Sequence, residues 1–120
     1  LLQRTAMDSR EYLAIKANFY GRINALSAEF GAPKTVFLAV YEDDESMRFF
    51  RPSESWTGGN AAHTELMRQL AADASADFAP IKFEIKIIET AEYWRWLATT
   101  KQKDTDVNRA QFISLQTSNR

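Results

Sequence analysis

The chain contains no cysteine and only one histidine among its 120 residues. Without cysteine it can form neither a disulfide scaffold nor a cysteine-ligated zinc or iron–sulfur site. No serine, aspartate or glutamate stands in a recognisable catalytic motif, so the usual nucleophilic and hydrolytic mechanisms are not indicated. We therefore expect a protein that is not an enzyme and that uses no metal and no cofactor.

An excess of charge of one sign is also absent, with 15 basic against 16 acidic residues. Duplex-DNA-binding proteins normally carry a basic excess, because phosphate contacts dominate their affinity. No apolar run approaches the ~20 residues of a membrane span, and no signal-peptide pattern is visible. We expect a cytoplasmic protein that binds no membrane, with linker or cloning residues at 1–6, one domain at 7–115 and a frayed tail at 116–120.

The clearest pattern is a stripe of large apolar side chains at helical spacing in the first 30 residues. Its members are Tyr12, Ile15, Phe19, Ile23, Leu26 and Phe30. Steps of three and four residues place them on one side of a helix. We predict a helix from about Ser9 to Phe30 that buries Phe19, Ile23 and Leu26 against a sheet.

Three segments have the composition of strands. Residues 35–41 are apolar on both alternating faces, which is typical of a strand covered on both sides. Residues 42–46 form a polar turn, and 47–51 then predict a return strand that stops at Pro52. Residues 81–87 alternate apolar and charged side chains, as expected for a strand with one wet face.

Further helices are predicted over residues 61–72, from Thr90, and from Asp104 or Asp106. The order is then α-β-β-α-β-α-α. We expect an α+β fold, with a long N-terminal helix and two to three further helices on a small, mostly antiparallel three-stranded sheet. Three strands are few, so a second copy or a partner strand could complete the sheet.

Tryptophan and arginine mark the expected partner-binding surface. Trp94 is turned about 100° from Tyr93 on a helix, so it is hard to bury with the core stripe. Tryptophan and arginine are enriched at binding hot spots. We predict that the partner-binding residues are Trp56, Trp94, Arg95, Arg48 and Arg51.

Two segments suggest contacts with phosphates. Arg48 and Arg51 flank Phe49-Phe50, an arrangement that suits stacked bases and backbone phosphates. Gly58, Gly59 and Asn60 precede a helix whose first turn contains His63, and such a segment can hold an anion. The favoured interpretation of the second segment is, however, a flexible loop with Asn60 as the helix cap.

Acidic residues give the remaining alternatives. The cluster Glu42–Glu45 could bind a hard cation, but a solvated turn is the favoured interpretation, because turn chemistry already explains these residues. Glu84 and Lys86 have the E-x-K form of magnesium-dependent nucleases, with Asp43 or Asp44 as the further metal ligand, and the same spacing arises on any amphipathic strand.

Taken together, these features predict a small non-enzymatic binding protein of inhibitor or accessory type that covers a protein partner. Homodimerisation through the same surface is also plausible. A nucleic-acid or nucleotide-phosphate-binding protein is the first alternative, and a magnesium-dependent nuclease the second.

Overall fold

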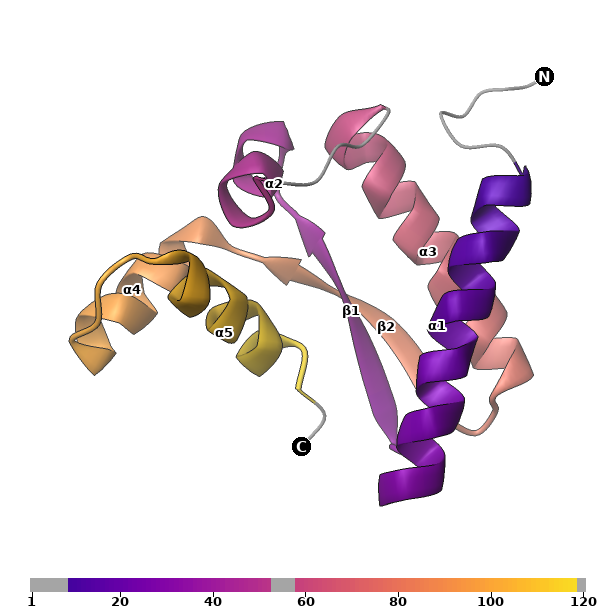
Figure 1. Ribbon diagram of the computed structural model, residues 1–120. Coiled ribbons are helices and arrows are strands. Elements are labelled where there is room, and N and C mark those ends of the chain that lie inside the picture. Colours follow the sequence, from indigo (N-terminus) through magenta and orange to yellow (C-terminus); the bar gives the residue numbers. More distant parts are fainter. Residues whose placement is uncertain (1–8, 53–57, 119–120) are drawn as a thin grey trace.

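The computed structural model describes residues 9–52 and 58–118. Within these ranges five helices and two strands follow one another along the chain (Figure 1). They are α1 Ser9–Phe30, β1 Thr35–Tyr41, α2 Asp44–Phe50, α3 Gly59–Asp77, β2 Lys82–Ile88, α4 Thr90–Thr100 and α5 Asp106–Gln116. The fold thus belongs to the broad α+β class, with helices in the majority.

The sheet has two parallel strands, so the prediction of a three-stranded, mostly antiparallel sheet was wrong. β1 pairs with β2 from Thr35↔Lys82 to Tyr41↔Ile88. The segment 47–51, predicted as a return strand, lies largely within helix α2. With no hairpin, the chain crosses from β1 to β2 through α2 and α3, and such a crossover connects parallel strands.

Local chemistry explains why α2 is a helix. The Asp43 side chain accepts a hydrogen bond from the Ser46 backbone N–H at 2.8 Å, which is the geometry of a helix N-cap. Met47 and Phe50 are both buried. Residues three apart share one face of a helix but point to opposite faces of a strand, so the helix buries both against the same core.

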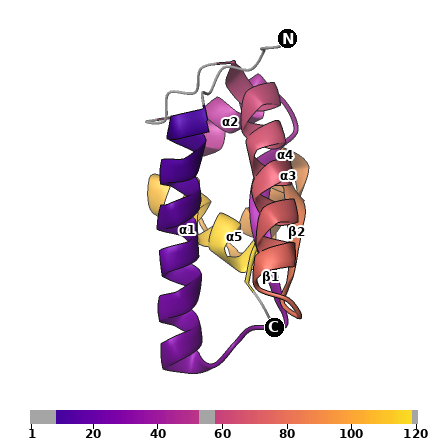
Figure 2. The same ribbon diagram turned by 90° about the vertical axis from the view of Figure 1, so that its right-hand side faces the viewer.

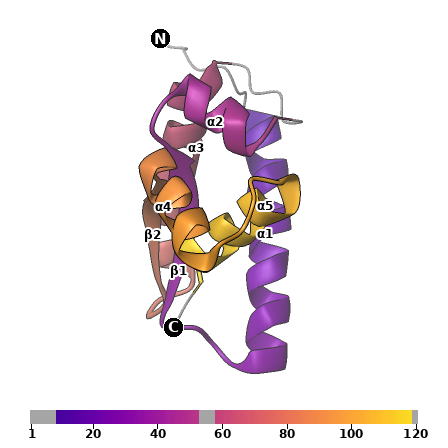
Figure 3. The ribbon, with the colours of Figure 1, turned by 90° about the vertical axis from the view of Figure 1, so that its left-hand side faces the viewer.

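The helices form layers on the two faces of the sheet. Seen from one side, α1 and α3 lie in front of the strands (Figure 2); from the other side, α4 and α5 do (Figure 3). α3 spans Gly59–Asp77 and is therefore longer than the helix predicted over residues 61–72. The sheet therefore separates two hydrophobic clusters.

The first cluster, on the side of α1 and α3, is mainly aliphatic. Its buried members are Ile23, Leu38, Leu70, Ala71, Ala74, Ile81 and Phe83. The second cluster, on the side of α2, α4 and α5, is mainly aromatic. Its buried members are Tyr41, Met47, Phe50, Ile88, Tyr93, Leu97 and Phe112.

Only part of the stripe on α1 is buried. Ile23 is buried and Phe19 packs on Phe83 with the ring centroids 5.9 Å apart. Leu26 and Phe30, however, are 50% and 75% exposed, so the expected burial of Leu26 was wrong. A helix of 22 residues is about 33 Å long, and its last turns extend beyond the surface on which its middle packs.

Polar bonds attach α1 to α3 at the edge of the first cluster. The Tyr20 hydroxyl donates to Asp77 at 2.7 Å, the Tyr12 hydroxyl donates to Asp73, and Lys16 Nζ lies 3.4 Å from Asp73. Burial and the carboxylate acceptors raise the pKa of both tyrosines, and the Tyr12 hydrogen bond lowers the pKa of Asp73. These bonds hold two helices whose sequence positions are far apart.

Candidate functional site

The two outer edges of the sheet carry backbone groups whose direction follows from the register. Lys82 N–H donates to the Lys34 carbonyl at 3.1 Å, across the start of the β1–β2 pair. Because alternate residues of a strand direct their N–H and C=O groups to opposite sides, every second residue of β2 from Lys82 bonds β1. The backbone groups of Phe83, Ile85 and Ile87 therefore point away from β1, and on β1 those of Ala39 and Tyr41 point away from β2.

The outer edge of β1 is partly covered by side chains of α3. The Asn60 amide donates to the Tyr41 carbonyl at 3.0 Å, and His63 Nε2 lies 3.1 Å from the Ala39 carbonyl. His63 is buried at 4% exposure and its ring lies 5.7 Å from that of Tyr41. Two residues predicted to bind an anion therefore contact the backbone of β1.

The outer edge of β2 is covered only at its beginning. The Phe83 N–H donates to Ser75 Oγ at 3.2 Å, and the same hydroxyl donates to the Phe83 carbonyl at 3.4 Å. Within the described ranges, the outward N–H and C=O groups of Ile85 and Ile87 have no protein partner. β2 thus offers two alternate residues, Ile85 and Ile87, whose outward backbone groups are open for pairing with another strand.

A groove lies beside this open edge. Asn60 and His63 in the first turns of α3 contact the edge of β1, and Ser75 in its last turns contacts the edge of β2, so the helix crosses the sheet obliquely. Among the described residues it leaves the outer edge of β2 uncovered at Ile85 and Ile87. The groove has a volume of about 670 Å³, and its lining includes Ile85 and Ile87 of β2, Thr64, Glu65 and Arg68 of α3, and Val40 and Tyr41 at the end of β1. Ile87 is 52% exposed. We call this feature the β2 groove.

Next to the groove, three consecutive acidic residues each bond the N-terminus of a different helix. Glu42 accepts from Thr90 N–H of α4 (3.1 Å), Asp43 from Ser46 N–H of α2 (2.8 Å) and Asp44 from Asn60 N–H of α3 (2.6 Å). Carboxylates at these positions satisfy unpaired N–H groups and the positive end of each helix dipole. The acidic cluster predicted as a solvated turn or cation site thus contributes helix caps.

Glycine allows the close approach of Asp44 to α3. Gly58, the N-cap residue, and Gly59 have φ values of +87° and +67°, which L side chains rarely adopt. A Cβ at Gly59 would lie 2.6 Å from Asp44 Oδ1. The glycines predicted as an anion cradle therefore receive a carboxylate of the chain itself.

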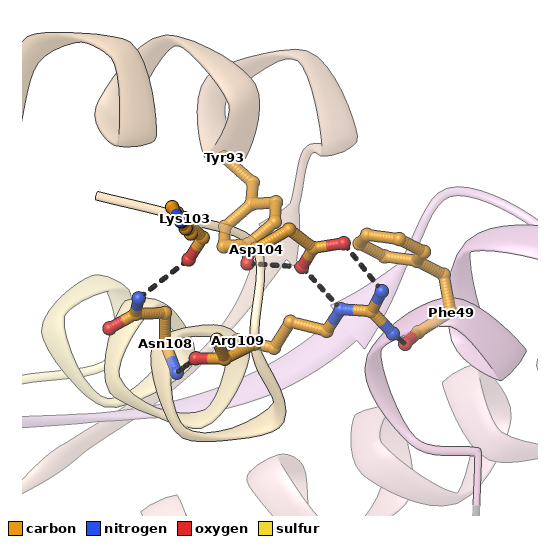
Figure 4. Close-up of polar contacts among 7 residues, drawn as sticks. Phe49, Tyr93, Lys103, Asp104, Asn108 and Arg109 are labelled. Carbon is orange, nitrogen blue, oxygen red and sulfur yellow. Dashed lines mark hydrogen bonds and ion pairs between the residues drawn. The ribbon is translucent and has the colours of Figure 1, made fainter. Parts of the chain in front are cut away.

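An arginine that the sequence analysis did not single out connects α5 to the second cluster (Figure 4). Arg109 donates two bonds of 2.7 Å to Asp104 and a third to the Phe49 carbonyl, and its guanidinium lies 3.7 Å from the centre of the Phe49 ring. The buried Tyr93 donates to Asp104 at 2.6 Å. These contacts join three helices, and nothing in the local sequence around Arg109 indicates them.

The charges of this cluster are mutually stabilised. The Arg109 hydrogen bonds lower the pKa of Asp104 to about 2, and Asp104 raises the pKa of Arg109. Burial, with the hydrogen bond to Asp104, raises the pKa of Tyr93 to about 12. Each shift preserves the protonation state that makes the hydrogen bonds, so the cluster is structural in character.

The described residues predicted to bind a partner come from α2, its C-cap and α4. Trp94 is 46% exposed and packs against Phe49 and Tyr93, at centroid distances of 5.6 and 5.3 Å. Arg95 pairs with Glu92 at 2.6 Å on the exposed side of α4. Arg48 is exposed on α2, Arg51 lines a separate pocket of about 430 Å³ beside Ile113, and Trp56 lies outside the described residues.

Glu84 and Lys86 are exposed on β2, as the alternating pattern predicted.

In the part of the chain that the structure describes, no group of three or more histidine, aspartate or glutamate side chains could hold a metal ion, and no helix is long and apolar enough to cross a membrane. Neither a protein-family model nor a curated protein matches the chain. The geometry of the β2 edge is therefore the main guide to function.

Proposed function

We propose that this chain is a small non-enzymatic protein-binding module that takes up an extended polypeptide segment as an added strand along β2. The observation that carries the proposal is the pair of outward-facing positions, Ile85 and Ile87, whose backbone groups find no hydrogen-bond partner among residues 9–52 and 58–118. Exposed strand edges are templates for pairing with another chain. In strand addition, backbone hydrogen bonds supply affinity and pockets for alternate side chains supply specificity.

The β2 groove supports this mode of binding because it offers both kinds of contact. An added strand would bond the Ile85 and Ile87 backbone while every second side chain faced α3. Ile85 and Ile87 supply apolar surface, and Glu65 and Arg68 add charges of both signs to the lining of the groove. The favoured segment is extended, with apolar residues at alternate positions. An inhibitor or accessory protein could bind its partner in this way.

Amide exchange tests the proposal at single residues. Extended peptides selected from a random displayed library would be added to the isotopically labelled chain, and amide exchange followed by NMR. The Ile85 and Ile87 amides should exchange rapidly in the free monomer and slowly with peptide. The Lys86 and Ile88 amides, which face β1, should be protected in both states, since paired strand amides open only with the sheet.

A matched pair of substitutions supplies the control. Ile87→Lys places a charge beside the open edge and should weaken peptide binding by about tenfold or more, because charged edge positions oppose strand pairing. Val107→Lys introduces the same side chain on α5, where Val107 is 74% exposed and does not line the groove, and should leave affinity unchanged. Protection of other amides, or equal effects of the two substitutions, would contradict the proposal.

A further inference from the structure

We infer that the segment received by β2 is β2 of a second copy, paired antiparallel about a two-fold axis through Ile85. The inference rests on the proposed function, because it uses the same open edge, and it adds the identity of the partner. The strand has the sequence Lys82-Phe83-Glu84-Ile85-Lys86-Ile87-Ile88. Its charges are self-complementary when two copies meet in this register.

The register follows from which residues face outward. With Ile85 opposite Ile85 of the second copy, outward groups meet outward groups and two backbone hydrogen bonds form at the centre. Glu84 then lies opposite Lys86 of the second copy, and the symmetry produces this pair twice. Such positions are non-hydrogen-bonded pairs, in which the side chains of antiparallel strands approach most closely, and opposite charges there are stabilising.

Other centres are less favourable. An axis at Glu84 or at Lys86 places that residue opposite its own copy, so like charges meet. An axis at Phe83 would also pair opposite charges, but Ser75 already bonds the Phe83 N–H and carbonyl. An axis at Ile87 leaves Glu84 and Lys86 without opposite charges. Ile85 is the centre that combines open backbone groups with charge complementarity.

The apolar side of the pair is also consistent. Ile87, half exposed in one copy, lies opposite Phe83 of the other, on the face where α3 packs. The central Ile85 pair bonds without rearrangement, and the outer bonds form when the Ser75 hydroxyl releases Phe83. The product is a continuous four-stranded sheet, a common size among proteins, in which the open edge of β2 is paired in both copies.

A charge-swap experiment tests this register on the full chain. Dimerisation would be measured by sedimentation equilibrium over a wide range of concentration. Glu84→Lys and Lys86→Glu, each alone, convert both opposite-charge pairs into like-charge pairs and should weaken the dimer by about tenfold. The double variant E84K/K86E restores opposite charges and should recover wild-type association. Glu29→Lys, an equal charge change at an exposed position of α1, should have no effect.

Folding is not at risk in these variants, because Glu84 and Lys86 are exposed and make no ion pair among the described residues. Circular dichroism of each monomer checks this. Three results would overturn the inference. The wild-type chain could stay monomeric, the single swaps could leave the dimer affinity unchanged, or the double variant could fail to recover wild-type association. If a monomeric chain still shows peptide-dependent protection of Ile85 and Ile87, the proposed function stands and only the second copy is wrong. If protection is absent as well, both fail.

Discussion

The two faces of the sheet are packed in different ways. The first cluster has Ala71 and Ala74 where α3 meets the strands, so that helix approaches closely, while α1 is attached through hydroxyl–carboxylate bonds at its edge. The second cluster consists of contacting rings, with centroid separations of 5.4 Å between Tyr93 and Phe112 and 5.5 Å between Phe50 and Tyr93. The helices of this cluster are also joined by the hydrogen bonds of Arg109 and Asp104 with Phe49 of α2 and Tyr93 of α4.

The two sides also differ in which residues they leave exposed. On the second side the cluster packs α2, α4 and α5 together, and large buried rings contribute most per residue to stability. Glu84 and Lys86 of β2 remain exposed on that same face of the sheet. Both sides leave large apolar side chains exposed: Leu26, Phe30 and Ile87 on the first side, and Trp94, Val107 and Leu115 on helices of the second. The Cα radius of gyration of 15.4 Å exceeds the ~14 Å expected for a compact domain of this length. The open edge of β2 is the feature that the proposed strand binding requires.

The largest expected effect is a loss of packing in the second cluster. Phe112 is 2% exposed and contacts Phe50, Tyr93 and Trp96, so Phe112→Ala should lower the free energy of unfolding by about 3–5 kcal/mol. Phe19→Ala, in the half-buried stripe of α1, should cost about 1–2 kcal/mol, because less apolar surface returns to water. Urea unfolding of both variants checks the ranking, and an equal or larger loss for Phe19→Ala would reverse the comparison.

A smaller effect should depend on pH. The folded-state pKa of Asp104 is about 2, below the ~3.9 of an unfolded aspartate, so its contribution is present above about pH 4 and is lost as the pH falls towards 2. Asp104→Asn should therefore destabilise the protein at neutral pH, with the difference from wild type shrinking on acidification. Unfolding curves measured across this range test the sign. A difference that stays constant would show that charge at Asp104 contributes little.

The smallest expected effect concerns the bond between α1 and α3. Tyr20→Phe removes one hydroxyl that bonds Asp77 in an exposed setting and should cost about 0.5–1 kcal/mol. Tyr93→Phe removes the corresponding hydroxyl from a fully buried ring and should cost more, because Asp104 loses a partner. The melting temperatures of Tyr20→Phe and Tyr93→Phe compare a hydroxyl bond on the first side of the sheet with one on the second. Equal shifts in melting temperature would mean that burial does not distinguish these bonds.

Much of the secondary structure could be predicted because local patterns were strong. The stripe of α1 and the apolar run of β1 predicted both elements with the bounds found in the structure. The prediction of a strand over residues 47–51 was wrong because the helix found there, α2, has only seven residues, and so short a segment shows no clear hydrophobic period. The signal that could have corrected it was the Asp43 cap followed by Asp44 and Glu45, since acidic residues favour the first turn of a helix.

The open edge could not be predicted in the same way. The alternating pattern of β2 correctly placed Glu84 and Lys86 on an exposed face. On the other face, the exposed fraction of the side chains rises from Phe83 to Ile87, because α3 crosses the sheet obliquely. That crossing depends on contacts between segments that are distant in the sequence. Neither the direction of the backbone groups nor the position of Ser75 is encoded in a local motif.

The three acidic caps have a consequence for how this sequence can change. Glu42, Asp43 and Asp44 are adjacent, yet the helices they cap begin at residues 44, 59 and 90. Deleting or inserting one residue in this tripeptide would shift all three carboxylates relative to the N–H groups they bond. Length variation should therefore be far less tolerated here than in an ordinary surface turn, and a deletion scan across residues 40–46 should show a sharp minimum in the yield of folded protein.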